Sequence, residues 1–515
     1  KSFFMKKKYI INIYTMPSKK LNFSLAPIND NPVNLSGGQL TDGYSHKNGF
    51  PTIKFSIPAQ NVLLDVNNLY LSGQFLVQDT NGANITTAVA DIANYDINNG
   101  SATIPKQNCI NTSNWNGVAS VIDKVVIQSK KSQTELQTII NYSGYNSLKM
   151  GHKMNQEDYL NNGLTRNLCN GADSGFSNRH LNNTPTIAES RAASLTDKYV
   201  GQFFSIKLDV ALLQSQAIHL GNDFVGGLLL TLHLSPDSSV FHSRFRSINA
   251  LTTLADPTGV SYILKNVKLE GKYAVPTQQD LQAYNPVITM NSRVNLMNDV
   301  VSSENSNTYT PQLQMVKGVV NTFLDDNQSN NYLLNQNNFR VPCGLVEYQQ
   351  AKNNIRYPND FATKIVPNAQ SSSTAGVQVV SNLLTHPVCV QGDAELRLQF
   401  GRALLGGKLA AHTSSNVALT NDCLLGDYDA DSGNTNLIQR GDNTHPDLLG
   451  VAADYSNNVG QMQNFVNQDY ELKLSSGVNS GRANLPQTRA NRVSIQESYI
   501  RNFSQIDLRN LQKVQ

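Results

Sequence analysis

The sequence predicts an all-β protein assembled from stacked sheets. In residues 203–210, apolar side chains alternate with Ser205, Lys207 and Asp209, and in residues 228–234 leucine occupies every second position. A period of two places one side of a strand in a core and the other side near water. Polar stretches of tens of residues separate such segments. This layout is more typical of a shell or recognition protein than of a catalyst.

The length and composition predict two domains or one duplicated architecture. A chain of 515 residues exceeds one ordinary hydrophobic core. Its hydrophobic content of 39% is adequate for β-sandwiches, whereas its charged content of 15% is low against the roughly 25% typical of soluble proteins. A neutral polar surface suits a protein packed against many copies of itself. An AT-rich genome, which favours Asn, Lys, Ile and Tyr codons, would produce the same composition.

Charge and cysteine usage exclude several classes of protein. The net charge of +3 is too small to indicate a nucleic-acid-binding protein. Lysines at 6–8, Lys19 and Lys20 concentrate positive charge near the start of the chain. This segment could be an arm in weak contact with nucleic acid, but such a cluster is more often a solvated tail. The 5 cysteines are scattered, without a disulfide framework or zinc spacing, which indicates a reducing compartment.

We expect no membrane-spanning segment. No apolar run approaches the roughly 20 residues that a transmembrane helix needs. The segment Tyr9–Met16 follows three lysines as in a signal peptide, but polar residues interrupt it and no small-residue cleavage site follows. Met5 and Met16 could each start translation.

Short strands recur along the first half, and they favour a sandwich over βαβ units. The predicted strands are Ile53–Ile57, Leu69–Val77, Val121–Ile127, 203–210, 228–234 and Tyr262–Val275. A helix is expected within Glu135–Met150, with Leu136, Ile139 and Ile140 on one side. A short helix at Gln278–Tyr284 would serve as a connector. Residues 79–117 and 151–198 are predicted loops.

The second half repeats this layout without repeating the sequence. The predicted strands are Gln312–Phe323, Leu345–Ile355, Tyr470–Ser475 and an interrupted Val493–Leu508. Ala394–Leu405 could form a strand or a helix. Residues 366–385 and 406–468 are predicted loops.

One glycine-rich segment invites comparison with a phosphate-binding loop. Residues Gly401–Lys408 have the glycines and the lysine of that motif, but Gly407 intrudes before the lysine and Leu409 stands where Ser or Thr is required. The spacing therefore argues against a nucleotide site.

Three alternating carboxylates resemble the start of a calcium-binding loop. Asp427, Asp429 and Asp431 would converge on a cation, but the turn glycine comes one place late, at Gly433, and Ile438 replaces the closing glutamate. An adventitious surface cation is one interpretation, and a solvated acidic loop is the better one.

Histidines and cysteines form no recognisable catalytic or metal-binding pattern. Cys169 with His152 or His180 could form a thiol–imidazole pair, but no strand–turn–helix frame positions them. His233 falls on the polar face of its strand, where a surface histidine is more common than a metal ligand. The sequence thus predicts no enzyme, with no catalytic, cofactor-binding or metal residues and no cofactor.

The order of the segments resembles a known family of viral proteins. The matching segments are Gly49–Pro58, Leu69–Gly73, Val121–Ile127, Ile139–Tyr142, Phe204–Leu208, Gly227–Leu232 and Tyr262–Leu269. In this order they resemble the major capsid proteins of Polinton-like viruses and virophages, within the double-jelly-roll lineage of icosahedral DNA viruses. The resemblance is clearest over residues 40–275, and Asn353–Pro358 is its best match in the second half.

The resemblance implies an all-β double jelly roll, with two eight-stranded β-sandwiches, short helices and long loops. The implied division is an N-terminal arm (1–40), a first jelly roll (41–275), a linker (276–292) and a second jelly roll with a C-terminal segment (293–515). It also implies a homotrimer that forms a pseudo-hexameric capsomer and contacts neighbouring capsomers in an icosahedral shell.

Penton and minor capsid proteins are the other implied partners. The implied location is the virion, after assembly inside the host cell. Two alternative functions remain open at this point, a minor capsid or penton protein and a β-sandwich adhesin or carbohydrate-binding protein. The first usually has a single jelly roll, and the second would have aromatic clusters in loops and a secretion signal.

Overall fold

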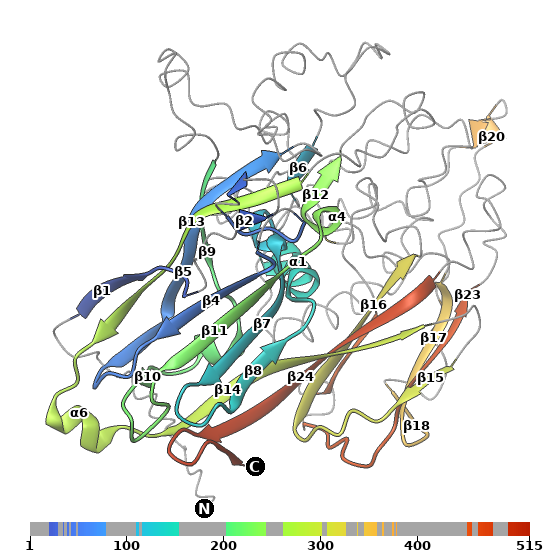
Figure 1. Ribbon diagram of the computed structural model, residues 1–515. Helices are drawn as coiled ribbons and strands as arrows, with labels where there is room; N and C mark the ends of the chain where they lie inside the picture. The colour runs from blue at the N-terminus through green and yellow to red at the C-terminus, as the bar shows by residue number, and fades with distance from the viewer. Residues whose placement is uncertain are drawn as a thin grey trace, which may run out of the picture.

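The strands lie in two sandwiches that stand side by side (Figure 1). The computed structural model describes residues 20–28, 34–35, 39–40, 43–47, 50–78, 110–112, 116–153, 202–243, 261–300, 306–325, 337, 345–357, 363–364, 373–374, 377–378, 451–455, 462–476 and 493–514. In Figure 1 the strands of the first half are on the left and most strands of the second half are on the right, while Val287–Val300 and the end of Val493–Asp507 run to the left beneath the first half.

The first sandwich pairs a five-stranded sheet with a four-stranded sheet. In order, the five-stranded sheet contains β1 (Lys20–Leu25), β13 (Ser261–Ala274), β5 (Leu63–Gln78) and β10 (Ile218–His219), with β9 (Gln202–Lys207) also on β5. The four-stranded sheet contains β4 (Thr52–Ile57), β11 (Leu228–Leu234), β7 (Ile122–Ser129) and β8 (Glu135–Ile139). All these pairings are antiparallel.

The second sandwich is built from two five-stranded sheets. One contains β14 (Val287–Val300), β24 (Val493–Asp507), β16 (Val316–Asp325) and β22 (Val451–Asp454), with β25 (Gln512–Val514) on β24. The other contains β15 (Ser306–Tyr309), β23 (Tyr470–Ser476), β17 (Leu345–Lys352) and β18 (Ile355–Tyr357), with β19 (Thr363–Lys364) on β17. Three small ribbons complete the described strands: β2 (Asn34–Leu35) with β3 (Gln39–Leu40), β6 (Ile110–Thr112) with β12 (Phe241–Ser243), and β20 (Ser373–Thr374) with β21 (Val377–Gln378).

Both sandwiches have the same strand order. In the first, the main strands in chain order are β1, β4, β5, β7, β8, β9, β11 and β13, and in the second they are β14, β15, β16, β17, β18, β22, β23 and β24. In each set, one sheet joins the first, eighth, third and sixth strands, and the other joins the second, seventh, fourth and fifth. This connectivity is that of a jelly roll. The predicted all-β double jelly roll is therefore confirmed.

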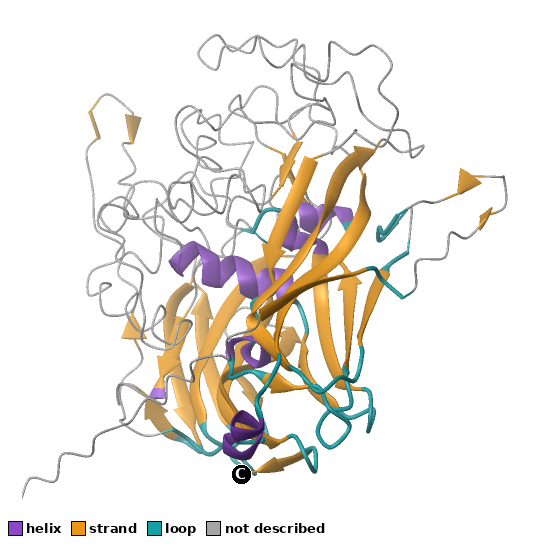
Figure 2. Cartoon of the chain, turned by 90° about the vertical axis from the view of Figure 1, so that its left-hand side faces the viewer, coloured by secondary structure: helices purple, strands orange, loops and turns teal. Residues whose placement is uncertain are grey.

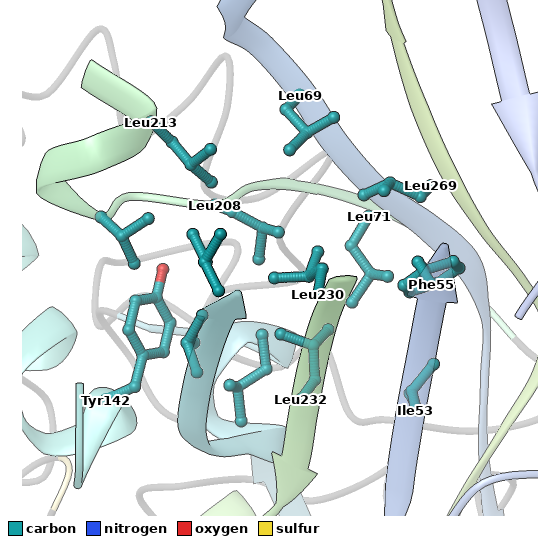
Figure 3. Close-up of a cluster of buried hydrophobic side chains, with 14 of the residues drawn as sticks. Ile53, Phe55, Leu69, Leu71, Tyr142, Leu208, Leu213, Leu230, Leu232 and Leu269 are labelled. Atoms are coloured by element: carbon teal, nitrogen blue, oxygen red, sulfur yellow. The ribbon is translucent and has the colours of Figure 1, made fainter. Parts of the chain in front are cut away.

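Alternating side chains create the core of the first sandwich. Phe55 on β4 and Leu230 on β11 point toward Leu71 on β5 and Leu269 on β13, across the space between the sheets (Figure 3). These side chains are buried. Burial of each contributes about 1.5–3 kcal/mol. The period-two pattern in the sequence thus predicted the correct core face of these strands.

Helices are few and short in the described part of the chain (Figure 2). They are α1 (Tyr142–Lys153), α4 (Asp237–Val240) and α6 (Gln278–Ala283), with 3-10 turns η2 (Val118–Val121) and η5 (Ala211–Gln214). The helix predicted within Glu135–Met150 was partly wrong, because its first residues form β8. Leu136 and Ile139 are buried from this strand, which pairs with β7, so the helix begins only at Tyr142.

A capped helix connects the two sandwiches. The Thr277 hydroxyl accepts a hydrogen bond from the Asp280 amide (3.2 Å), and the Thr277 amide donates to the Asp280 carboxylate (2.8 Å). This reciprocal box fixes the start of α6 at the foot of the first sandwich. The chain enters β14 at Val287, inside the range expected for the linker. Likewise, β1 falls inside the range expected for the N-terminal arm and pairs along β13.

Several features of the second half differ from expectation. The predicted loop 366–385 contains the ribbon of β20 and β21, and the strand predicted at Leu345–Ile355 is divided between β17 and β18. The predicted loop 406–468 contains β22, which forms an edge of its sheet beside β16. The strand predicted to start at Gln312 starts at Val316. Ala394–Leu405 lies outside the described residues. The interior also contains polar groups, since Asn321 donates to the Tyr470 hydroxyl at 2.7 Å and both side chains are fully buried.

Candidate functional site: the seam between the sandwiches

For a protein with no catalytic motif, the first structural candidate for function is the contact that joins its two halves. We call this contact the seam. It brings α1 and the turn before it, from the first sandwich, against β24 of the second. Asn141 stands in this turn with a φ of 49°, a left-handed conformation that asparagine tolerates better than most residues. Its side-chain oxygen accepts from the Gly144 amide at 3.3 Å, which caps the first turn of α1.

A polar cluster lies at the centre of the seam. Asn141 Nδ2 donates to Glu497 Oε1 at 2.7 Å and to the Tyr499 hydroxyl oxygen at 3.2 Å. The Tyr499 hydroxyl in turn donates to Glu497 Oε2 at 2.8 Å. Glu497 is only 4% exposed and Tyr499 is fully buried. Because both carboxylate oxygens accept a hydrogen bond, burial of this charge is compensated.

Aromatic and basic groups extend the cluster along β24. The ring of Tyr145, on α1, packs against that of Tyr499 with 5.6 Å between centroids. Arg501 is buried farther along the strand. Burial lowers the pKa of Arg501, and nearby Tyr145 and Asp454 act in the opposite direction. Glu497 and Arg501 of β24 are thus buried on the side of the strand that carries Tyr499.

Apolar contacts continue the seam toward the foot of the molecule. Ile288 and Met290 of β14, together with Ile506 and Leu508 at the end of β24, belong to the same buried cluster as the core of the first sandwich. Burial of an apolar surface between the two halves favours a fixed arrangement of the sandwiches.

A buried ion pair holds α1 in place. Lys149 Nζ lies 2.6 Å from Asp209 Oδ2, and the Asp209 amide donates to the Tyr142 hydroxyl oxygen at 3.0 Å. The sequence predicted Asp209 on the polar face of a strand. That prediction was wrong, because β9 ends at Lys207 and the chain turns Asp209 inward, where it is 5% exposed.

The connector is anchored by an aromatic group around His219. The His219 ring packs on Phe224 and Tyr284, with 4.4 and 5.7 Å between ring centroids. The Tyr284 hydroxyl oxygen accepts from the His219 amide at 3.1 Å. Burial lowers the pKa of His219, while Asp223 acts in the opposite direction. The residue after α6 is thereby tied to β10.

Most residues considered for chemistry lie outside the described residues. This holds for Gly401–Lys408, the aspartates at 427, 429 and 431, Cys169 and His180. His152 lies in α1. His233 is half-buried on β11, and burial together with Lys124 lowers its pKa. The described part of the chain has no group of three or more His, Cys, Asp or Glu side chains placed to hold a metal ion.

Sequence reasoning did not find the seam. Glu497 and Arg501 are charged residues in a strand with strand-like neighbours, and such residues ordinarily point to water. The alternation of Glu497, Tyr499 and Arg501 was the available signal, because one face of the strand carries a tyrosine between two charges.

No helix in the described ranges is long and apolar enough to cross a membrane.

Comparisons with known proteins concern the fold. No protein-family model matches the chain, and no curated protein matches it. A chain from the structure of the Sputnik virophage is similar, with a TM-score of 0.48 and 10% identity, over 98% of this chain and 89% of that one. The mavirus major capsid protein has a TM-score of 0.45 and 9% identity over 97% and 90% of the two chains. The Faustovirus major capsid protein has a TM-score of 0.42 and 9% identity over 97% and 92%. These scores are low, so the jelly-roll assignment rests on the strand order of this chain.

Proposed function

We propose that this protein is a major capsid protein of a double-stranded DNA virus, a structural subunit of an icosahedral shell. The observation that carries the proposal is the pair of jelly rolls with identical strand order, joined by a buried seam. A rigid block of two equivalent sandwiches offers two similar sets of edges and loops to its neighbours. That geometry suits tiling. The proposal gives the chain a structural role, not a catalytic one, and places it in the virion.

The subunit would form a homotrimer, because cyclic closure completes an interface between identical chains. Three copies of two sandwiches present six similar units, which is the basis of a pseudo-hexameric capsomer. Exposed apolar side chains that neighbouring copies could cover include Phe203 (69% exposed), Ile355 (74%) and Ile28 (56%). They lie on different elements, so the contacts would be distributed around the subunit.

Within this proposal, the chain divides into an N-terminal arm, a first jelly roll, a linker over 276–292 and a second jelly roll. Separate penton and minor capsid proteins would complete the shell, and lysines at the start of the chain would make a weak contact with nucleic acid. Residues 1–19 lie outside the described part of the chain, and Lys20 is exposed at the start of β1.

Electron microscopy of the purified protein, together with native mass spectrometry, tests the proposal. We expect trimers that assemble into closed shells or flat hexagonal arrays. A stable monomer that forms neither would overturn it. Specific binding to glycans by that monomer would instead favour a β-sandwich adhesin, and five-fold rings alone would favour a penton protein.

A further inference from the structure

Equivalent sheets of the two sandwiches differ in whether their outer faces are covered. The sheet that joins the first, eighth, third and sixth strands contains β13 in the first sandwich and β24 in the second, and we call these the β13 sheet and the β24 sheet. On the outward side of β24, Glu497, Tyr499 and Arg501 are buried. Tyr499 packs on Tyr145 of α1. The seam therefore covers the β24 sheet around its eighth strand.

The neighbouring strands continue this covered face. Asn321 on β16 points inward, because it donates to Tyr470 of the other sheet, so Val320 and Thr322 point outward. Ala452 of β22 pairs with Val320 and lies on the same side. All three outward side chains are buried. The third and sixth strands of the second sandwich thus present an uncharged strip that is hidden from water.

The same face of the β13 sheet is open. Its sixth strand is β9, where Ile206 is buried in the core, so Ser205 and Lys207 point outward, as does Phe203. Ser72 of the third strand, β5, pairs with Ser205. Phe203 is 69% exposed, and both serines are half-buried. We call this surface the outer face, and it includes the exposed, outward residues of β13, which are Lys268, Glu270 and Lys272.

A second open surface lies at the other end of the molecule. In the seam, the fifth strand of the first sandwich, β8, lies beside β14. The fifth strand of the second sandwich is β18, where Ile355 is 74% exposed and Arg356 is exposed. We call β18 and its neighbour β17 the β18 side. In Figure 1, β1 and β13 lie toward the left of the molecule and β18 lies toward the right.

We propose that the outer face of one copy packs on the β18 side of a second copy, as the β24 sheet packs on the β8 side within the chain. This inference rests on the proposed function, in which identical chains form a trimer. The two surfaces differ and lie at opposite ends of the subunit, so the contact is head-to-tail. Such contacts generate a closed ring when the rotation between copies permits it. Seams and contacts between copies would then alternate around the ring.

The composition of the outer face indicates where this contact is most sensitive. Phe203 is a large apolar side chain beside the uncharged pair of Ser72 and Ser205, and an aromatic residue in such a position is a frequent anchor of an interface. Lys268 and Lys272 lie on β13, toward the polar rim that surrounds an interface core. A negative charge at Phe203 should therefore disrupt the contact.

Two blocking variants of the full chain test the direction of the contact. Phe203→Asp blocks the outer face, and Ile355→Asp blocks the β18 side. Each should weaken association by at least roughly tenfold and yield monomers in native mass spectrometry, at a concentration where the unmodified protein is trimeric. An equal mixture of the two variants should form a heterodimer, because one variant keeps its outer face and the other keeps its β18 side. This heterodimer cannot close into a ring, since both of its remaining surfaces are blocked.

Val275→Asp is the matched control. It makes the same kind of change at a position that is 40% exposed, between β13 and α6, and it should leave the trimer intact. Hydroxyl-radical footprinting provides a second readout. Phe203 should be protected in the unmodified trimer and oxidised in the Ile355→Asp monomer, whereas Val275 should react equally in both. Unchanged thermal unfolding of each variant verifies that the fold is intact.

Three outcomes would overturn the inference and leave the proposed function standing. They are a trimer that persists in both blocking variants, a mixture of the two variants that stays monomeric, and equal oxidation of Phe203 in trimer and monomer. An unmodified protein that is monomeric would overturn both this inference and the proposed function, so the two failures are distinguishable.

Discussion

Asn141 of the first sandwich donates a 2.7 Å hydrogen bond to Glu497 of the second, across 356 residues of sequence. Each residue also makes a hydrogen bond within its own sandwich: Asn141 caps α1, and Glu497 accepts from the Tyr499 hydroxyl. One side chain therefore couples the start of a helix to the orientation of the neighbouring sandwich. A change at either residue should affect how the two halves fit together, as well as the stability of each half.

Replacement of Asn141 by glycine should destabilise the seam. Glycine adopts a φ of 49° without strain, so the variant isolates loss of the side chain. The buried Glu497 would lose one donor, which should lower the free energy of unfolding by about 1–3 kcal/mol. Urea denaturation measures this change.

Asn141→Asp should lower stability further at neutral pH, because it places a second carboxylate against Glu497. The additional loss should shrink in acid, where one carboxyl becomes protonated. If Asn141→Asp were as stable as the unmodified protein at pH 7, the seam contact would contribute nothing.

Two adjacent leucines on β11 allow a core position to be compared with a position on the opposite side of the sheet. Leu230 is 2% exposed and faces the other sheet, whereas Leu229 is half-buried on the opposite side. Leu230→Asp should lower the free energy of unfolding by several kcal/mol, roughly 4 or more, because it buries an unpaired carboxylate. Leu229→Asp should cost much less. Leu208→Asp, at a site 1% exposed, should behave like Leu230→Asp, and yield of soluble oligomer together with thermal unfolding tests all three.

Gly227 stands where a side chain cannot fit. Its φ is +88°, and an added Cβ would lie 2.5 Å from the Ile57 carbonyl oxygen. Gly227→Ala should therefore lower the free energy of unfolding by about 1–3 kcal/mol through the pairing of β4 with β11.

Gly271→Ala provides a comparison at the sheet edge. Its Cβ would meet the ring of Phe23 at 2.6 Å, and Phe23 belongs to the edge strand β1. The expected result is faster amide hydrogen exchange confined to residues 20–25, with little change in global stability. Equal global loss in both glycine variants would contradict this distinction.

Asp237 should make stability depend on pH. Burial raises its pKa from 3.8 to about 6, opposed by a hydrogen bond from the Tyr262 amide and by Lys47. The folded state therefore binds a proton more tightly than the unfolded state, and the free energy of unfolding should fall as pH rises from about 4 to 6.

Asp237→Asn should remove this dependence while keeping an acceptor for Tyr262. At pH 7 the variant should be more stable by as much as about 2–3 kcal/mol. Chemical denaturation at pH 4, 5, 6 and 7 measures both curves. Parallel curves for the two proteins would show that Asp237 does not contribute.

Two strands of the first sandwich could be predicted most clearly from sequence because they bury mainly one face. Residues 228–234 and Ile53–Ile57 alternate clearly; the first range matches β11, and the second lies within β4, which starts one residue earlier. Leu136 and Ile139 are three residues apart, a spacing that favours a helix, because a regular strand would place them on opposite faces. The register of β8 shifts at Leu136, which the pairing skips. Pairing with β7 decided between helix and strand. The strand β22 escaped prediction because Val451–Asp454 is short and contains two alanines, which have weak strand preference.

The seam could not be derived from local patterns. Glu497 and Lys268 are both charged residues in strands, yet one is buried and the other exposed. Their burial differs because α1 packs on the sheet beside Glu497, and this contact joins segments that are distant in sequence.

The pairing of β1 with β13 has a consequence during synthesis of the chain. Lys20 lies opposite Ala274, so the first sandwich gains its complete set of strands once that residue has left the ribosome. All its sheet partners precede β14. The first jelly roll can thus close its sheets while the second is still being translated, as domains generally fold from the N-terminus onward. The apolar surface that later meets Ile506 stays uncovered until that residue has been translated, and during that interval the nascent chain should depend most on chaperones.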